Sequence, residues 1–460
     1  MIRIFNHYVH RQTLLQVLTD SGLLVVAMLM VFAWQLGSVD KLMPFAGTHV
    51  LSLAAGMLVI GTASGIYQQS GNLSLVQTCA RAAMMLLLAL PLTYAIFALL
   101  PGDFLNRGST QFAAMCGMGV VVARRVYLTH WSSNQRIRSR VLVFGAGPAA
   151  QIVSHTLQAS DPNVEIVGFL PGPNEKELAV PAAGVLRSDK SLLETARTLA
   201  VDEIVVALTE RRAGSKPLRQ LLDCKLSSIN VYDLATHFEK RLGQIRIDFV
   251  NAGWLVFGDG FNQGALRTAV KRVFDVMFSV ALIVLSAPIM IGAALLIKLD
   301  SRGPVFYRQE RVGSNGSTFM VTKFRSMCTD AEKDGKPRWA SAQDDRVTRV
   351  GNFIRRVRID ELPQLFNVLM GHMSLVGPRP ERPYFVEQLT QQIPYYAVRH
   401  SVKPGVTGWA QVRYQYGSTV EDSQEKLQYD LYYVKNHSLF LDLVVLFETI
   451  GVVLTGKGAR

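Results

Sequence analysis

Long apolar stretches dominate the first 130 residues and are separated by short polar connections. They cover approximately residues 14–36, 50–66, 82–100 and 112–123. A helix needs about 20 apolar residues to cross the hydrocarbon core of a bilayer. The pattern therefore predicts a membrane α-helical bundle of four spans over residues 1–130, although the short fourth stretch also fits a buried or interfacial helix.

Basic residues flank this bundle at both ends. Arg3 and Arg11 precede the first stretch, and the fourth is followed by Arg124, Arg125, Arg136, Arg138 and Arg140. The two loops at residues 37–49 and 101–110 carry one basic residue each. Because Lys and Arg concentrate in cytoplasmic segments, both ends of the bundle are expected on the cytoplasmic side of a bacterial inner membrane.

The pattern changes after residue 139, where short apolar runs alternate with helical ones. Strands are expected near residues 140–144, 164–170 and 203–208, with a helix at 191–200. This alternation predicts a Rossmann-like domain with a parallel α/β sheet at residues 139–235, followed by a linker at 236–267.

A glycine-rich turn follows the first of these strands. Gly145, Gly147 and Ala150 give a G-x-G-x-x-A pattern of the dinucleotide-binding kind. An acidic residue should end the second strand to hold the ribose of NAD, but that strand runs into Pro171-Gly172-Pro173. The pattern favours a scaffold or dimerisation module over an NAD site, and it leaves a homodimer open.

A second hydrophobic region covers residues 273–299 and is interrupted by Pro288. Proline removes a helix hydrogen bond, and Ser286 can bond a local carbonyl. Composition alone allows an ordinary kinked span. Basic residues at both ends instead favour a re-entrant helix that enters and leaves on the cytoplasmic side, within a second α/β domain at residues 268–460.

The last apolar stretch, residues 438–455, carries Asp442 and Glu448. A charge deep in the bilayer is costly. We therefore expect a helix that lies in the membrane interface or packs on the re-entrant hairpin.

The bulk composition agrees with a membrane protein of two or three domains. The chain has 460 residues, 49% of them hydrophobic, and a formal net charge of +13. Nucleic acid, anionic lipid and phosphorylated substrates all suit that charge. The four cysteines form no C-x-x-C pair, so neither a disulfide framework nor a zinc site is indicated.

Polar and basic residues follow the broken hydrophobic region. Residues 301–360 contain 13 Lys and Arg against 7 Asp and Glu. Lys323 and Arg325 follow strand-like runs, and Arg379 lies in a rigid Gly-Pro-Arg-Pro turn. Three further arginines come just before residue 360: Arg355, Arg356 and Arg358. Forked guanidinium groups suit phosphate oxygens, although a solvated or lipid-facing basic surface is the alternative.

Two adjacent acids, Asp360 and Glu361, open a predicted helix. Its apolar face is expected from Leu362, Leu365, Phe366 and Leu369. The helix dipole and the nearby arginines favour ionised carboxylates. Such a pair can hold Mg²⁺ together with substrate phosphate oxygens, whereas acids that only stabilise a helix start are the alternative.

Ordered motifs run through the second half of the chain. They are FYRQER at 306–311, KFRSM at 323–327, DELPQLFN at 360–367, SLVGPRP at 374–380 and KPGVTGWAQ at 403–411, with a C-terminal stretch at 429–442. Together they resemble the monotopic phosphoglycosyl transferases. The four spans and the Rossmann-like domain further resemble the polyprenyl-phosphate hexose-1-phosphate transferases of exopolysaccharide synthesis.

The resemblance implies a reaction, a metal and site residues. Hexose-1-phosphate would pass from a UDP-sugar (UDP-glucose or UDP-galactose) to undecaprenyl phosphate, releasing UMP, through a phosphosugar–aspartate intermediate. Asp360 would be the nucleophile and would hold Mg²⁺ with Glu361. The phosphates would lie near Lys323, Arg325, Arg355 and Arg379, and the hairpin would break at Ser286 and Pro288.

Two positions depart from the family pattern. Ala287 stands before the hairpin proline where many relatives have Ser, and His372 stands where many have Asp. Because the dyad and the basic residues are intact, we expect a tuned loop and retained activity.

Two other functions compete with this one. A membrane-attached NAD-dependent nucleotide-sugar dehydratase or epimerase needs a Y-x-x-x-K pair, and no Lys in this chain follows a Tyr by four positions. A non-enzymatic scaffold for polysaccharide assembly gives no reason for the dyad. The expected partners are therefore a UDP-sugar, a polyprenyl phosphate and the membrane, with no nucleic acid.

Overall fold

The computed structural model divides the chain into two compact units. It describes residues 2–4, 7–9, 11–36, 50–52, 54–56, 58, 107–130, 139–160, 164–172, 175, 178–186, 190–208, 218–250, 255, 260–261, 264–328, 346–414, 417 and 419–455. One unit comprises residues 1 and 10–242, and the other comprises residues 2–9 and 243–460. Strands β1 (Ile2–Ile4) and β2 (His7–Val9) form an antiparallel pair.

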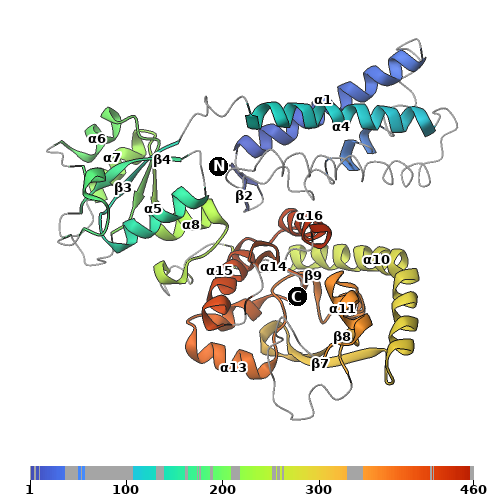
Figure 1. Cartoon of the computed structure of the whole chain (residues 1–460). Coiled ribbons are helices and arrows are strands. Elements are labelled where there is room, and N and C mark those ends of the chain that lie inside the picture. The colour runs from blue at the N-terminus through green and yellow to red at the C-terminus, as the bar shows by residue number, and fades with distance from the viewer. Residues whose placement is uncertain are drawn as a thin grey trace. The chain divides into compact units, whose positions relative to one another are not determined.

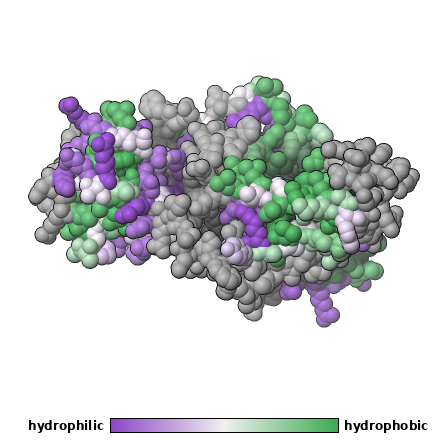
Figure 2. Space-filling view, turned by 90° about the horizontal axis from the view of Figure 1, so that it is seen from above, coloured by the Kyte–Doolittle hydropathy of each residue, from purple (hydrophilic) through white to green (hydrophobic). Residues whose placement is uncertain are grey.

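Two long helices, α1 (Arg11–Leu36) and α4 (Arg107–His130), pack against each other in the first unit. Leu24, Met28 and Phe32 of α1 meet a small-residue face of α4 that includes Ala113 and Ala114. The outward faces of these helices are apolar. Figure 2 shows hydrophobic patches on the face of the molecule that is seen from above. An apolar outer face suits a helix surrounded by lipid.

A buried ion pair also joins the two helices, between Asp20 and Arg124. Asp20 is fully buried. Charges in an apolar interface are stable only when paired, so this contact restricts the register of α1 against α4.

The predicted spans are seen only in part. Within the described residues, the segments long and apolar enough to cross a membrane are Leu14–Trp34 and Gly264–Asp300, and Gln111–Arg124 is a shorter apolar helix. The first and fourth predicted spans thus lie in α1 and α4. The second is described only at some of residues 50–58, and the third lies outside the described residues.

The parallel α/β sheet predicted after residue 139 is confirmed. Its strands are β3 (Ser139–Phe144), β4 (Val164–Leu170), β5 (Glu203–Val206) and β6 (Asn230–Asp233), all parallel in the order β4-β3-β5-β6. Helices α6 (Leu192–Thr198) and α7 (Leu218–Leu226) pack with one face of the sheet. Helices α5 (Pro148–Ser160) and α8 (Leu234–Leu242) lie on the other side (Figure 1).

The glycine-rich turn between β3 and α5 is filled by a side chain of the same domain. Gly145 has φ 133°, and a Cβ there would lie 2.6 Å from the Ala207 carbonyl oxygen, so only glycine fits. Glu175 Oε2 accepts hydrogen bonds from the N–H groups of Ala146 at 2.7 Å and Gly172 at 3.0 Å. A dinucleotide-binding turn offers such N–H groups to phosphate.

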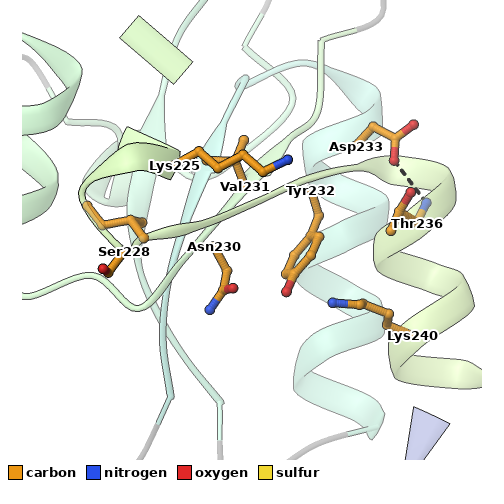
Figure 3. Close-up of a pocket in the computed structure, with 9 residues that line it drawn as sticks. Lys225, Ser228, Asn230, Val231, Tyr232, Asp233, Thr236 and Lys240 are labelled. Atoms are coloured by element: carbon orange, nitrogen blue, oxygen red, sulfur yellow. Dashed lines mark hydrogen bonds between the residues drawn. The ribbon is translucent and has the colours of Figure 1, made fainter. Parts of the chain in front are cut away.

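A hollow of about 540 Å³ lies along β6, at the edge of this sheet. Figure 3 shows Asn230, Tyr232 and Lys240 on its wall, with Lys240 Nζ 3.8 Å from the centre of the Tyr232 ring. None of the sequence-predicted site residues lines it. The sequence-predicted site residues all lie in the second unit.

The second unit combines short strands with helices. After residue 243 its strands are β7 (Phe306–Val312), β8 (Thr318–Phe324), β9 (Ser374–Val376) and β10 (Gly405–Thr407). Its α-helices are α10 (Gly264–Asp300), α11 (Arg349–Arg356), α12 (Gln364–Met370), α13 (Pro383–Gln392), α14 (Trp409–Arg413), α15 (Val420–Asn436) and α16 (Leu439–Thr455). Strands β7 and β8 form an antiparallel hairpin, whereas β9 and β10 are a parallel pair.

Helix α10 contains the second hydrophobic region and has Pro288 in its interior. A straight helix of its 37 residues would be about 55 Å long, well beyond a hydrocarbon core of about 30 Å. Its ribbon instead turns sharply along its length (Figure 1). Ser286 Oγ donates to the Leu282 carbonyl at 2.6 Å, which is the local bond expected of that residue.

Both ends of α10 are bonded to the rest of the second unit. Near its start, Arg272 donates to the Val368 and Leu369 carbonyls of α12 at 2.5 and 2.6 Å. At its end, Arg325 donates to the Ser301 carbonyl at 2.7 Å. One compact body of protein therefore holds the beginning and the end of the hydrophobic helix.

The C-terminal helix α16 is also joined to α10. Asp442, which is fully buried, accepts a hydrogen bond from Lys271 of α10 at 2.7 Å and another from the Tyr433 hydroxyl at 2.6 Å. Asp442 is thus neutralised inside the protein, and Glu448, the second acid of this helix, pairs with Arg413.

The filled turn leads to a prediction about cofactor use. We expect the purified full chain to show no saturable NAD(H) binding in calorimetry, because Glu175 already accepts hydrogen bonds from the Ala146 N–H of the turn and from the nearby Gly172 N–H. A verified NAD-binding dehydrogenase is the positive control. Micromolar binding would contradict this prediction and revive the oxidoreductase alternative.

Candidate active site

Glu361 lies at the centre of a charged cluster. Its Oε1 accepts hydrogen bonds from Lys323 Nζ and Arg379 Nη2, each at 3.0 Å. Arg358 Nη1 lies 3.9 Å from the same oxygen. Glu361 is only 8% exposed, and a buried carboxylate is stable only when it is paired. The cluster therefore ties together the three chain segments that supply the cations.

The dyad sits on a 3-10 turn, η5 (Ile359–Glu361), between α11 and α12. Arg358, just before the turn, has φ 59°, in the left-handed region that side chains rarely adopt. The α-helix begins only at Gln364, after Pro363. The predicted helix start at Asp360 is therefore wrong, because a left-handed residue and a 3-10 turn come first.

The buried face of α12 also differs from the apolar stripe expected from spacing. Leu365 and Val368 are buried, and so is the polar Asn367, whereas Phe366 is 40% exposed. The short helix thus points the polar side chain of Asn367 into the protein. The spacing of apolar residues could not predict that a polar residue would be buried here.

Asn367 fastens α12 to strand β8. Its Nδ2 donates to the Met320 carbonyl at 2.7 Å, and its Oδ1 accepts from the Thr322 N–H at 3.0 Å. These two bonds fix the strand immediately before Lys323. The amide of Asn367 thereby helps to set the position of that ammonium group beside Glu361.

Arg379 reaches the cluster from a turn with little freedom. The Gly377 N–H donates to the Thr407 carbonyl, and the Gly405 N–H donates to the Pro378 carbonyl, both at 2.9 Å. These bonds attach the turn to β10. Prolines on both sides of Arg379 restrict its backbone further.

Asp360 has a different environment from its neighbour. It is 8% exposed, and its Oδ1 has no hydrogen-bond partner among the described residues. Burial, together with the charge of Glu361, raises the pKa of Asp360 to about 6. Burial would also raise the pKa of Glu361, but Lys323, Arg379 and Arg358 outweigh it and hold that pKa far below its usual value. Neighbouring acids with separated pKa values are typical of catalytic sites.

The structure does not bring every predicted arginine to the dyad. Arg325 is 5% exposed, and its guanidinium bonds the carbonyls of Ser301 and Arg302 at the end of α10. Arg355 lies half-buried on α11, and within the described part of the chain no hydrogen bond or ion pair joins it to the dyad. Arg358 is one of the three arginines that the sequence places close to the two acids, but the family resemblance does not assign it to the phosphates.

The donor set fits a magnesium ion. Mg²⁺ usually takes one or two protein carboxylates and completes its shell with water and substrate phosphate. Asp360 has a buried oxygen without a partner, and Glu361 is adjacent. The described residues contain no group of three or more His, Cys, Asp or Glu side chains placed to hold a metal, so a site here would depend on the substrate for ligands.

Comparison with known proteins shows the family of the chain. The family model described as bacterial sugar transferase matches residues 266–456, which include the dyad and its cations. The chain is 33% identical, over 75% of each sequence, to the UDP-glucose:undecaprenyl-phosphate glucose-1-phosphate transferase of Escherichia coli (strain K12). It is 31% identical to the enzyme of the same name from Xanthomonas campestris pv. campestris, over 80% of this chain and 78% of the relative.

Another relative carries a different sugar in its name. The chain is 43% identical, over 56% of its own length, to the UDP-N-acetylgalactosamine-undecaprenyl-phosphate N-acetylgalactosaminephosphotransferase of Aeromonas hydrophila, and it spans 60% of that protein. The family model covers the residues that form the charged cluster, and the match to the Escherichia coli protein extends over 75% of the chain. On this evidence the chain belongs to the bacterial sugar transferase family and is an enzyme of the transferase class.

Proposed function

We propose that the chain transfers a sugar-1-phosphate from a UDP-sugar to undecaprenyl phosphate and releases UMP. The observation that carries the proposal is the asymmetric dyad. Glu361 is neutralised by three cations, whereas the Asp360 Oδ1 beside it is buried and without a partner among the described residues. Such an oxygen suits a nucleophile held for attack on phosphorus.

The reaction divides into two balanced steps. First, an Asp360 oxygen bonds to the β-phosphorus, and the bond from that phosphorus to the oxygen bridging the α- and β-phosphates breaks. UMP leaves with the electron pair, and an acyl phosphate carrying the sugar remains. In the second step an oxygen of undecaprenyl phosphate attacks the same phosphorus, and the Asp360 carboxylate is released.

The chain's own cations supply the charge that these steps need. Phosphoryl transfer spreads negative charge over the phosphoryl oxygens, and fixed cations stabilise it. Lys323, Arg358 and Arg379 converge on Glu361 and exceed its single charge. We assign the phosphate-binding role to these three residues. Arg325 has a structural role instead, because it bonds the Ser301 carbonyl at the end of α10.

Asp360 and Glu361 would also hold Mg²⁺ with phosphate oxygens of the donor. The ion would neutralise charge on the phosphates during transfer. Lys323 and Arg379 hold the Glu361 carboxylate in place, so the Asp360 carboxylate has more freedom to change its orientation around the ion.

The contacts of α10 support a re-entrant helix in the cytoplasmic leaflet. Arg272 near its start and Arg325 at its end both bond the same compact unit. Several of its apolar side chains, including Met277 and Leu285, are more than half exposed and suit lipid. A helix with both ends held on one body of protein returns to the side from which it entered. The lipid phosphate would then meet Asp360 at the membrane surface.

The covalent step gives the first test of the reaction. Asp360→Asn keeps the side-chain shape but removes the nucleophile, so UMP release should fall by more than about a thousandfold. Protein labelling from a UDP-sugar carrying ³²P in the β-phosphate should also disappear. The donor panel should contain UDP-glucose, UDP-galactose and UDP-N-acetylgalactosamine.

A matched control is Asp248→Asn, the same change at an exposed carboxylate paired with Arg246. It should retain wild-type turnover. Near wild-type turnover of Asp360→Asn, or UMP release that always requires lipid phosphate, would exclude the covalent intermediate in favour of direct transfer.

The raised pKa of Asp360 predicts a pH dependence. As the pH falls through about 6, the Asp360 carboxylate takes up a proton and loses its nucleophilic form. Single-turnover UMP release without acceptor lipid should therefore decline about tenfold per pH unit below that pKa. A bound cation stabilises the ionised form of the carboxylate and lowers its pKa. A higher Mg²⁺ concentration should therefore move the decline in the rate of UMP release to lower pH. A rate that is flat down to pH 4.5 would rule out Asp360 as the titrating group.

The re-entrant topology can be tested with exposed positions at the two ends of α10. In a background with the native cysteines replaced by serine, Leu266→Cys and Arg302→Cys should both resist an impermeant thiol reagent in intact cells. Both should react once the membrane is opened. Ser38→Cys, in a loop expected in the periplasm, is the positive control. Labelling of only one α10 end in intact cells would demonstrate a full span.

A further inference from the structure

Three successive carbonyl groups of the Arg379 turn each accept a hydrogen bond. The Pro378 carbonyl accepts from the Gly405 N–H at 2.9 Å. The Arg379 carbonyl accepts from Arg399 Nη2 at 3.0 Å, and the Pro380 carbonyl accepts from Arg311 Nη1 at 3.0 Å. Two side-chain guanidiniums therefore fix the main chain on either side of the Arg379–Pro380 peptide bond.

Arg399 is itself held by a buried carboxylate. It lies on η6 (Tyr396–Ser401), is 5% exposed, and donates through Nε to Asp430 Oδ2 at 2.9 Å. Its Nη2 lies 2.7 Å from the same oxygen, and its Nη1 donates to the Tyr396 hydroxyl at 3.0 Å. Asp430 lies on α15 and is 2% exposed. The guanidinium fork thus has three different partners arranged around it.

We propose that Arg399, oriented by Asp430, is a positioning residue that acts on the reaction through Arg379. The inference rests on the proposed function. Arg399 is too enclosed to meet a substrate, yet it bonds the main chain of the residue whose side chain binds Glu361. Any shift of that carbonyl also moves the start of the Arg379 side chain. The position of the Arg379 guanidinium relative to the dyad then changes.

Arg399→Lys separates this role from simple charge pairing. Lysine keeps a cation beside Asp430, but its single ammonium group cannot reproduce the planar fork that reaches Tyr396 and the Arg379 carbonyl together. We expect kcat/KM for the UDP-sugar to fall about tenfold, because a small displacement of a catalytic group is costly. Calorimetric affinity for UDP, measured without turnover, should weaken in parallel.

A double-variant comparison tests whether the effect passes through Arg379. In an Arg379→Gln background the side chain that Arg399 positions is gone, so Arg399→Lys should cause little further loss of kcat/KM or UDP affinity. A purely structural role would instead reduce both backgrounds by the same factor. Equal reductions, or wild-type kcat/KM in Arg399→Lys, would overturn the inference.

Two further variants keep the test decisive. Arg413→Lys makes the same substitution in another ion pair of this unit, with Glu448, and should leave kcat/KM unchanged. If Arg399→Lys does not fold in thermal melts, Tyr396→Phe removes one partner of the fork. Its loss of kcat/KM must then also vanish in the Arg379→Gln background, or the inference fails. A wild-type protein that releases no UMP from any donor would instead count against the proposed function.

Discussion

The buried carboxylate of Glu361 is the constraint on which the site depends. Taking it out of water is unfavourable unless cations accompany it, and Lys323, Arg358 and Arg379 come from separate segments to do so. Their positions fix strand β8, the start of the dyad turn and the Gly-Pro-Arg-Pro turn together. The neighbouring Asp360 receives no comparable neutralisation, so one acid is fixed as an anion while the other keeps a reactive oxygen.

A second use of guanidinium groups connects this site to the hydrophobic helix. Arg272 bonds the last carbonyls of α12, and Arg325 bonds the carbonyls at the end of α10. Helix ends leave carbonyl groups without internal partners, and a buried cation satisfies several at once. Because α12 follows the dyad directly, these contacts hold the reactive acids at a fixed distance from α10.

The sequence indicated the parallel sheet and the meeting of Asp360 and Glu361 with Lys323 and Arg379, because strand patterns and ordered motifs carry that information. It could not tell which arginines bind phosphate and which bond carbonyls, since a guanidinium suits both. The inward Asn367 and the left-handed backbone at Arg358 were also missed. Both depend on contacts between distant segments, which apolar spacing does not encode.

A buried carboxylate also organises the glycine-rich turn of the parallel α/β domain. The turn at Gly145 offers N–H groups as a dinucleotide site would, but Glu175 accepts the bonds from Ala146 and Gly172. In the catalytic unit the carboxylate of Glu361 is held by three cations, and a second acid, Asp360, stands beside it. A buried carboxylate oxygen without a partner among the described residues occurs at both sites, on Glu175 Oε1 and on Asp360 Oδ1. The two sites therefore differ in their cations and in the second acid, because cations that exceed the charge of one carboxylate can also stabilise a phosphate.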